Sequence, residues 1–129
     1  MKKLVSFFLL TFLVGICIAE KKAEEPMSLY SIMVNGKYGL INNTGKVVVE
    51  PKFERIGILS EGIRTIEKDG KDGYIEETTG KIIIEPQFDY AQPFSEGLAV
   101  ARIGGLKKGK DGYIDKSGKF IITQRQNSR

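Results

Sequence analysis

The sequence predicts an all-β fold, in which an N-terminal signal peptide precedes three tandem three-stranded antiparallel meander units. Three observations predict this fold. First, one motif occurs three times, as "GKYGLINNTGKVVVEP" from Gly36, "GKDGYIEETTGKIIIEP" from Gly70 and "GKDGYIDKSGKFIIT" from Gly109. Second, each copy holds two short runs rich in β-branched and aromatic residues, which favour strands. Third, a glycine-bearing turn separates the two runs, as in a β-hairpin.

A third strand precedes each hairpin. The segments "SLYSIMV", "GIRTIEK" and "GLAVARI" supply these strands. Three strands joined by tight turns cannot bury their own apolar face, so we expect the units to stack and share a core. The predicted units span residues 29–50, 63–85 and 98–123, within one β-repeat domain at 29–123.

The three hairpin turns are predicted to depend on glycine. Gly45, Gly80 and Gly118 lie where a left-handed backbone conformation closes a type I turn with a bulge. The second turn, "EETTGK", holds one residue more than the first and third, so we expect its loop to be longer by one residue.

Two segments connect the units, "PKFERIGILSEG" and "PQFDYAQPFSEG". Proline fixes φ and lacks an N–H donor, so we expect strands to stop at the connector prolines Pro51, Pro86 and Pro93. The connector phenylalanines are predicted to pack in the core, namely Phe53, Phe88 and Phe94.

Residues 1–19 have the composition of a secretory signal peptide. "MKK" is basic, and the uncharged apolar run that follows has 16 residues, whereas a transmembrane helix needs roughly 20. Two processing routes remain open. One is cleavage after Ala19; the other is lipidation of Cys17, because "VGIC" resembles a bacterial lipobox except at Ile16. Residues 20–28 form a polar linker, and 124–129 form a polar tail.

Cysteine content and charge exclude several classes of partner and site. Cys17 is the single cysteine, so the folded part is predicted to have no disulfide and no thiolate metal site. Removal of residues 1–19 takes away two lysines and no acidic residue, and lowers the net charge from +4 to +2. Basic and acidic residues are interspersed, so we expect no nucleic-acid partner.

The repeated motif resembles the WG repeat, also called the KWG repeat, of bacterial β-repeat proteins. The resemblance covers about residues 36–123 and includes the stretch "PQFDYAQPFSEGLA" after the second hairpin. It departs from the family pattern at the naming tryptophan, which is replaced by Tyr38, Asp72 and Asp111. The resemblance implies a repetitive β architecture and an interaction module, and it brings no catalytic, cofactor-binding or metal-binding residues.

Carboxylates are the main candidates for chemistry, because the chain has no histidine. Glu50 and Glu85 occupy matching positions and suit an acid/base pair, whereas Asp72 and Asp111 suit a hard cation. Their repeat spacing and turn context favour the structural interpretation, in which they are strand-end and turn residues. The turn serines have no usual base beside them, namely Ser60 and Ser95. We therefore expect no enzyme, no cofactor and no metal site.

The tyrosines of the motif are the candidate binding surface. Tyr38, Tyr74 and Tyr113, with Tyr90, form an aromatic strip beside the motif lysines if they share one face. Such a strip suits a glycan or a peptide. The favoured interpretation, however, is that these side chains pack in the core or between the units, because Tyr74 and Tyr113 lie inside strands, where apolar bodies usually pack.

The sequence thus predicts an exported, non-enzymatic protein of binding or scaffolding type, located in the periplasm, secreted or lipid-anchored to the envelope. Its expected partner is another envelope protein or a surface ligand, and it meets a membrane only through its signal peptide or a lipid anchor. The alternative is a structural envelope component that acts through lipid anchoring and edge-strand association. The strand "SLYSIMV" carries no charge, so its edge is the one most open to a partner strand.

Overall fold

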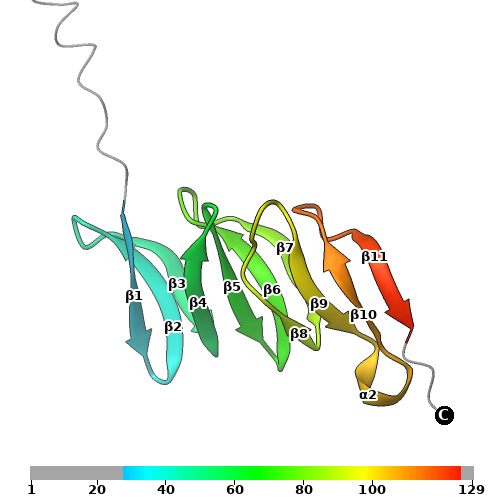
Figure 1. Ribbon diagram of the computed structural model, residues 1–129. Helices are drawn as coiled ribbons and strands as arrows, with labels where there is room; N and C mark the ends of the chain where they lie inside the picture. Colours follow the sequence, from blue (N-terminus) through cyan, green and yellow to red (C-terminus); the bar gives the residue numbers. More distant parts are fainter. Residues whose placement is uncertain (1–27, 126–129) are drawn as a thin grey trace, which may run out of the picture.

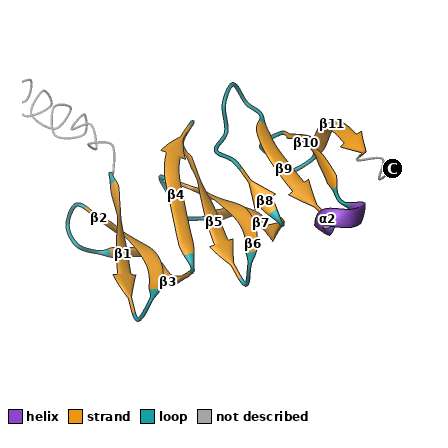
Figure 2. Cartoon of the chain, turned by 60° about the horizontal axis from the view of Figure 1, so that its bottom comes forward, coloured by secondary structure: helices purple, strands orange, loops and turns teal. Residues whose placement is uncertain are grey.

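The fold is all-β, as predicted. The computed structural model describes residues 28–125, in which three antiparallel sheets of three, four and four strands follow one another along the chain (Figure 1). The first sheet lies at one end of the row and the third at the other (Figure 2). The expected signal peptide, Cys17 and the linker up to residue 27 lie outside the described residues, as does the tail from residue 126.

The strands have the following bounds. The first sheet contains β1 (Leu29–Val34), β2 (Lys37–Asn42) and β3 (Val47–Phe53). The second contains β4 (Arg55–Ser60), β5 (Ile63–Lys68), β6 (Lys71–Glu76) and β7 (Ile82–Phe88). The third contains β8 (Tyr90–Ala91), β9 (Ala99–Ile103), β10 (Lys110–Ile114) and β11 (Phe120–Arg125). A one-turn helix, α2 (Gly105–Lys108), lies in the long loop between β9 and β10.

The connectors form strands, contrary to the expectation that strands stop at their prolines. β4 pairs antiparallel with β5, and β8 pairs with β9, so the second and third sheets gain a fourth strand from the connector that enters them. Only Glu54 separates β3 from β4, and only Asp89 separates β7 from β8. Each connector therefore leaves one sheet and joins the next within a single residue.

The prediction that strands stop at Pro51 and Pro86 is wrong, because both prolines lie inside strands. Pro93 lies in a loop, as predicted. In the first sheet, Tyr38 pairs with Phe53 and Leu40 pairs with Val49, so one residue of β2 faces three residues of β3. Pro51 is one of these three, and its missing N–H costs no ladder hydrogen bond because the ladder is broken there.

The residue opposite this bulge is glycine because nothing larger fits. A Cβ built on Gly39 would lie 2.4 Å from the carbonyl oxygen of Val49 and 2.8 Å from the nitrogen of Pro51. The second sheet repeats the arrangement, and a Cβ on Gly73 would lie 2.6 Å from the carbonyl oxygen of Ile84. The bulge bends the strand, and the bend directs the chain into the next sheet.

An ion pair lies at each crossing, the point at which the chain passes from one sheet to the next. Lys37 of β2 contacts Glu54 at 2.7 Å, and Lys71 of β6 contacts Asp89. The hydrogen bond from Lys37 is the main cause that lowers the pKa of Glu54, and the one from Lys71 does the same for the pKa of Asp89. These pairs hold the acidic residue after each phenylalanine against the lysine of its own sheet, where the chain leaves that sheet.

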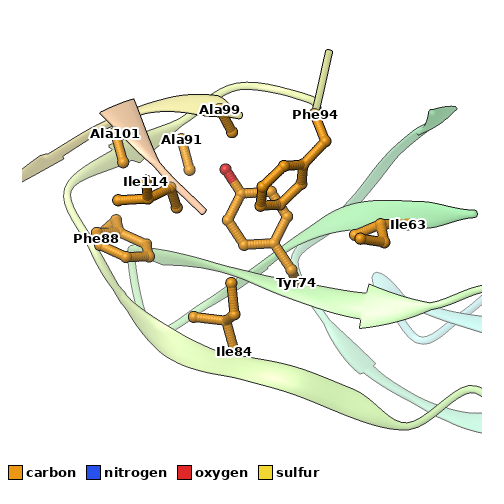
Figure 3. Close-up of a cluster of buried hydrophobic side chains, with 9 residues drawn as sticks. All are labelled: Ile63, Tyr74, Ile84, Phe88, Ala91, Phe94, Ala99, Ala101 and Ile114. Atoms are coloured by element: carbon orange, nitrogen blue, oxygen red, sulfur yellow. The ribbon is translucent and has the colours of Figure 1, made fainter. Parts of the chain in front are cut away.

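The core lies between the sheets, in two clusters. The first joins sheets one and two and contains Leu29, Leu40, Val49, Phe53, Ile66 and Ile75. The second joins sheets two and three and is drawn in Figure 3; it contains Ile63, Tyr74, Ile84, Phe88, Ala91, Phe94, Ala99, Ala101 and Ile114. The predicted burial of the connector phenylalanines is confirmed for Phe53, Phe88 and Phe94.

The turn glycines adopt the left-handed conformation, with φ of 83° at Gly45, 68° at Gly80 and 84° at Gly118. Two of them also touch the preceding sheet. A Cβ on Gly80 would lie 2.5 Å from Cγ2 of Val49, and a Cβ on Gly118 would lie 3.1 Å from Cγ2 of Ile84. The first of the three turns has no described sheet before it, and a Cβ on Gly45 would meet nothing within 4 Å.

We predict that Gly80→Ala lowers the free energy of unfolding more than Gly45→Ala, in urea titrations of the two variants. Both alanines carry the cost of positive φ, about 1–2 kcal/mol. Only Gly80→Ala also crowds Val49 across the sheet junction, which adds about 1–3 kcal/mol of overpacking. Equal losses would mean that the second turn does not pack on the first sheet.

Candidate binding site

Each sheet has two faces, and each face that meets another described sheet is apolar. In β6, Tyr74 packs in the cluster shared with the third sheet, whereas its neighbour Ile75 packs in the cluster shared with the first. Successive side chains of a strand point to opposite faces, so this assignment fixes the faces of the paired strands as well. The middle sheet is therefore covered on both faces, and each end sheet has one face without a described neighbour.

The open face of the third sheet is formed by Val100, Tyr113 and Ile122, which we call the C-terminal face. These residues are directly paired across β9, β10 and β11. Tyr113 is 46% exposed and Ile122 is 56% exposed. Together with Asp111 and Gly112, they line a hollow of about 210 Å³.

The repeat shows why these side chains are apolar. Tyr113 stands at the same motif position as Leu40 and Tyr74, both of which are 0% exposed because a following sheet covers them. Ile122 corresponds to Val49 and Ile84 in the same way, and these two are also buried. The C-terminal face is therefore a stacking surface that no described residue covers.

The open face of the first sheet is formed by Tyr30, Ile41 and Val47, which we call the N-terminal face. These residues are also paired directly, across β1, β2 and β3. Tyr30 is 55% exposed, Val47 is 41% exposed, and Ile41 is half-buried. Ile32 and Val34 flank the row on the same face of β1. None of these five side chains is charged.

The motif tyrosines do not form one strip. Tyr74 lies in the core, as the favoured interpretation predicts, and so is not part of a binding surface (Figure 3). Its hydroxyl donates a hydrogen bond to the carbonyl oxygen of Gln92 at 2.7 Å. Burial raises the pKa of Tyr74, and the charge of Asp72 raises it further. Tyr38 is half-buried, and Tyr90 is exposed on β8. Tyr113 is the candidate that lies in an open apolar surface.

The aspartates at the tryptophan position make structural contacts. Asp72 accepts a hydrogen bond from Arg55 at 3.0 Å and another from the backbone N–H of Ala91 at 2.8 Å, and so links the second sheet to β8 of the third. Asp111 accepts a hydrogen bond from Nη2 of Arg102 at 2.8 Å. The hydrogen bond and charge of Asp111 raise the pKa of Arg102.

The other candidates are also placed in structural roles or apart from one another. Glu50 and Glu85 are exposed on β3 and β7, which belong to different sheets. The hydroxyl of Ser60 donates to the carbonyl oxygen of Phe94 at 2.7 Å, and Ser95 exchanges backbone hydrogen bonds with Leu98. Within residues 28–125, no group of three or more Asp, Glu, His or Cys side chains is placed to hold a metal ion. No helix in this part of the chain is long and apolar enough to cross a membrane.

Two hairpin turns are fixed by side chains that the sequence patterns did not single out. The side chain of Asn42 accepts backbone N–H bonds from Thr44 and Lys46, at 3.0 and 2.9 Å. Asp115 does the same for Ser117 and Lys119, and the hydrogen bond from the Ser117 hydroxyl is the main cause that lowers the pKa of Asp115. The preference of Asn and Asp for such turns was the available signature in "INNTGK" and "IDKSGK".

The fold and its two open faces define a β-repeat protein, in which similar small sheets stack through apolar faces. The family model named WG containing repeat matches residues 38–71 and 73–106, which together make up more than half of the chain. The chain therefore belongs to the WG containing repeat family. Neither a curated protein nor a solved structure shows a significant match to it.

The two matched segments are offset from the sheets. Residues 38–71 include the last two strands of the first sheet and the first two of the second, and residues 73–106 repeat this pattern one sheet later. One repeat of the family thus contains one crossing between sheets, with its glycine and its proline bulge. The third copy of the motif, from Gly109, lies beyond the matched segments.

Proposed function

We propose that this chain is an exported, non-enzymatic binding or scaffolding protein that engages its partner through an end face of the sheet stack. The observation that carries the proposal is the C-terminal face. There, Tyr113 and Ile122 are about half exposed at motif positions that are buried in both preceding sheets. An apolar surface of this kind suits association with a protein surface.

The composition of the C-terminal face supports a protein partner. A tyrosine beside two aliphatic side chains provides a large apolar area with few rotatable bonds. The ion pair of Asp111 with Arg102 lies at the margin of the hollow and provides a polar rim. An apolar centre with a polar margin is the usual composition of a protein–protein interface.

The structural contacts of the candidate catalytic residues support a non-enzymatic role. Asp72 and Asp111 are held by arginines, and the hydroxyl of Ser60 is held by a backbone carbonyl. Side chains whose polar atoms are committed to structural contacts are poorly placed to move protons or to attack a substrate. Nucleic acid is an unsuitable partner, because the charges are mixed along the chain.

Export is the second part of the proposal and is supported by the sequence of residues 1–19. The partner is then another envelope protein or a surface ligand. The intact mass of the protein recovered from cells tests this part. Loss of residues 1–19 indicates simple cleavage, whereas loss of residues 1–16 with acyl chains on Cys17 indicates a lipoprotein. A mass that still includes residues 1–19 contradicts export through this segment.

The alternative function is a structural envelope component that acts through a lipid anchor and edge-strand association. The observation that favours it is the outer edge of β1, which lacks the additional strand that β4 provides to β5 and β8 provides to β9 in the described part of the chain. Met33 and Val34 of β1 are exposed, and an uncharged edge of this kind accepts a further strand.

We predict that p-benzoylphenylalanine in place of Tyr113 forms covalent protein adducts upon illumination of living cells. The same photo-crosslinker in place of Leu106, which is 83% exposed on α2 and lies outside the C-terminal face, serves as the matched control and should form few adducts. Ile122→Lys in the same chain should reduce the adducts at position 113. Adducts at position 113 that are no more abundant than at position 106 would contradict the proposed binding role of this face.

A further inference from the structure

We infer that the partner of the C-terminal face is the N-terminal face of a second copy of this chain, so that copies stack head to tail as the sheets do within one chain. This inference rests on the binding role proposed above and names the partner. Three observations carry it: the pairing pattern at the two internal junctions, the apolar composition of both open faces, and the turn at Gly45.

The internal junctions show which rows of side chains meet. Between the second and third sheets, the paired row that contains Tyr74 and Ile84 packs against the row that contains Ile114 and Phe120. Between the first and second sheets, Leu40 and Val49 occupy the first row, and Ile75 and Ile82 occupy the second. The same motif positions therefore meet at both junctions.

The open faces carry the same two sets of positions. Tyr113 and Ile122 correspond to the first row, and Ile41 and Val47 correspond to the second. One end of the chain thus presents the surface that the other end is shaped to accept. A junction between two copies repeats an interface that the chain already forms twice.

The composition of the two ends agrees with this arrangement. Repeat proteins that remain monomeric carry polar outer faces on their terminal repeats, since exposed stacking surfaces are poorly soluble. Here the exposed side chains of the two faces include Tyr30, Val34 and Val47 at one end and Tyr113 and Ile122 at the other. Burial of these apolar surfaces against each other removes both from water.

The turn at Gly45 provides space for the incoming sheet. A Cβ on Gly80 would meet Val49 and a Cβ on Gly118 would meet Ile84, each across a junction, whereas a Cβ on Gly45 meets nothing within 4 Å. Ile122 is the next residue in the series of Val49 and Ile84. In the inferred junction, the turn at Gly45 therefore packs on Ile122 of the preceding copy.

A head-to-tail contact is heterologous, which makes a decisive test available. Ile122→Lys damages the C-terminal face and leaves the N-terminal face intact, and Val47→Glu does the reverse. Each variant alone should be monomeric in sedimentation, because every junction then includes one damaged face. Their mixture should form a dimer and no larger species, since the intact C-terminal face of Val47→Glu binds the intact N-terminal face of Ile122→Lys.

Two control variants show whether a charge outside the two faces also prevents association. Leu106→Lys and Ile58→Glu place the same charges at exposed apolar positions outside the two faces, and both variants should associate as the unchanged chain does. Thermal melting shows whether the face variants fold. If one does not, Tyr113→Lys or Tyr30→Glu replaces it, since both sites are about half exposed.

Several outcomes overturn the inference. The first is an unchanged chain that is monomeric at every concentration reached. The second is association that persists in either face variant, which places the contact elsewhere, including at the edge of β1. The third is a mixture that remains monomeric. Photo-adducts at position 113 with a different protein, together with a monomeric chain, would retain the proposed binding function and reject a second copy as the partner.

Discussion

The structure depends on the close approach between a glycine of one strand and the proline bulge of the next. In the first two sheets, Gly39 and Gly73 face three residues each, and a side chain at either glycine would collide with backbone atoms. The bulge bends β3 and β7, which pair again with their own sheets at Phe53 and Phe88, and these two side chains are buried between the sheets. The approach alone does not redirect a strand, because a Cβ on Gly112 of the third sheet would lie 1.9 Å from the carbonyl oxygen of Ile122, yet β11 stays paired with β10. The strand is redirected where the glycine faces the three-residue proline bulge.

The third sheet shows what happens where the proline bulge is missing. It has Thr123 and Gln124 where the earlier units have Glu-Pro, and β11 pairs with β10 without a break from Tyr113 to Lys110. The chain therefore makes no further crossing within the described residues. Its forward face keeps the stacking side chains Tyr113 and Ile122 nonetheless, which is why the stack ends in an apolar surface. The third sheet thus ends the stack with an apolar face that no described sheet covers, and the proposed binding role and the inferred head-to-tail contact both follow from this.

The repeat period, the β-branched runs and the turn glycines were sufficient to predict the class of fold, the main strands and the positive φ at Gly45, Gly80 and Gly118. They did not predict the fourth strands of the second and third sheets. Those strands follow prolines that lie inside strands, and a proline fits there only opposite a bulge, which the sequence alone does not reveal. The sequence likewise did not predict that Tyr74 is buried whereas Tyr113 is exposed. The two residues occupy the same motif position, and only their places in the stack decide that one is buried and the other exposed.

Equilibrium unfolding of Gly73→Ala, compared with Gly70→Ala, tests the central claim most directly. Gly70 has φ of 72° and open space around it, so Gly70→Ala should lower the free energy of unfolding only by the cost of positive φ, about 1–2 kcal/mol. Gly73 needs no positive φ, but its alanine variant places a Cβ 2.7 Å from the nitrogen of Pro86 and 2.6 Å from the carbonyl oxygen of Ile84. We predict that Gly73→Ala loses about 3 kcal/mol or more, because rigid backbone must move. A loss at Gly73 no larger than the loss at Gly70 would contradict the account.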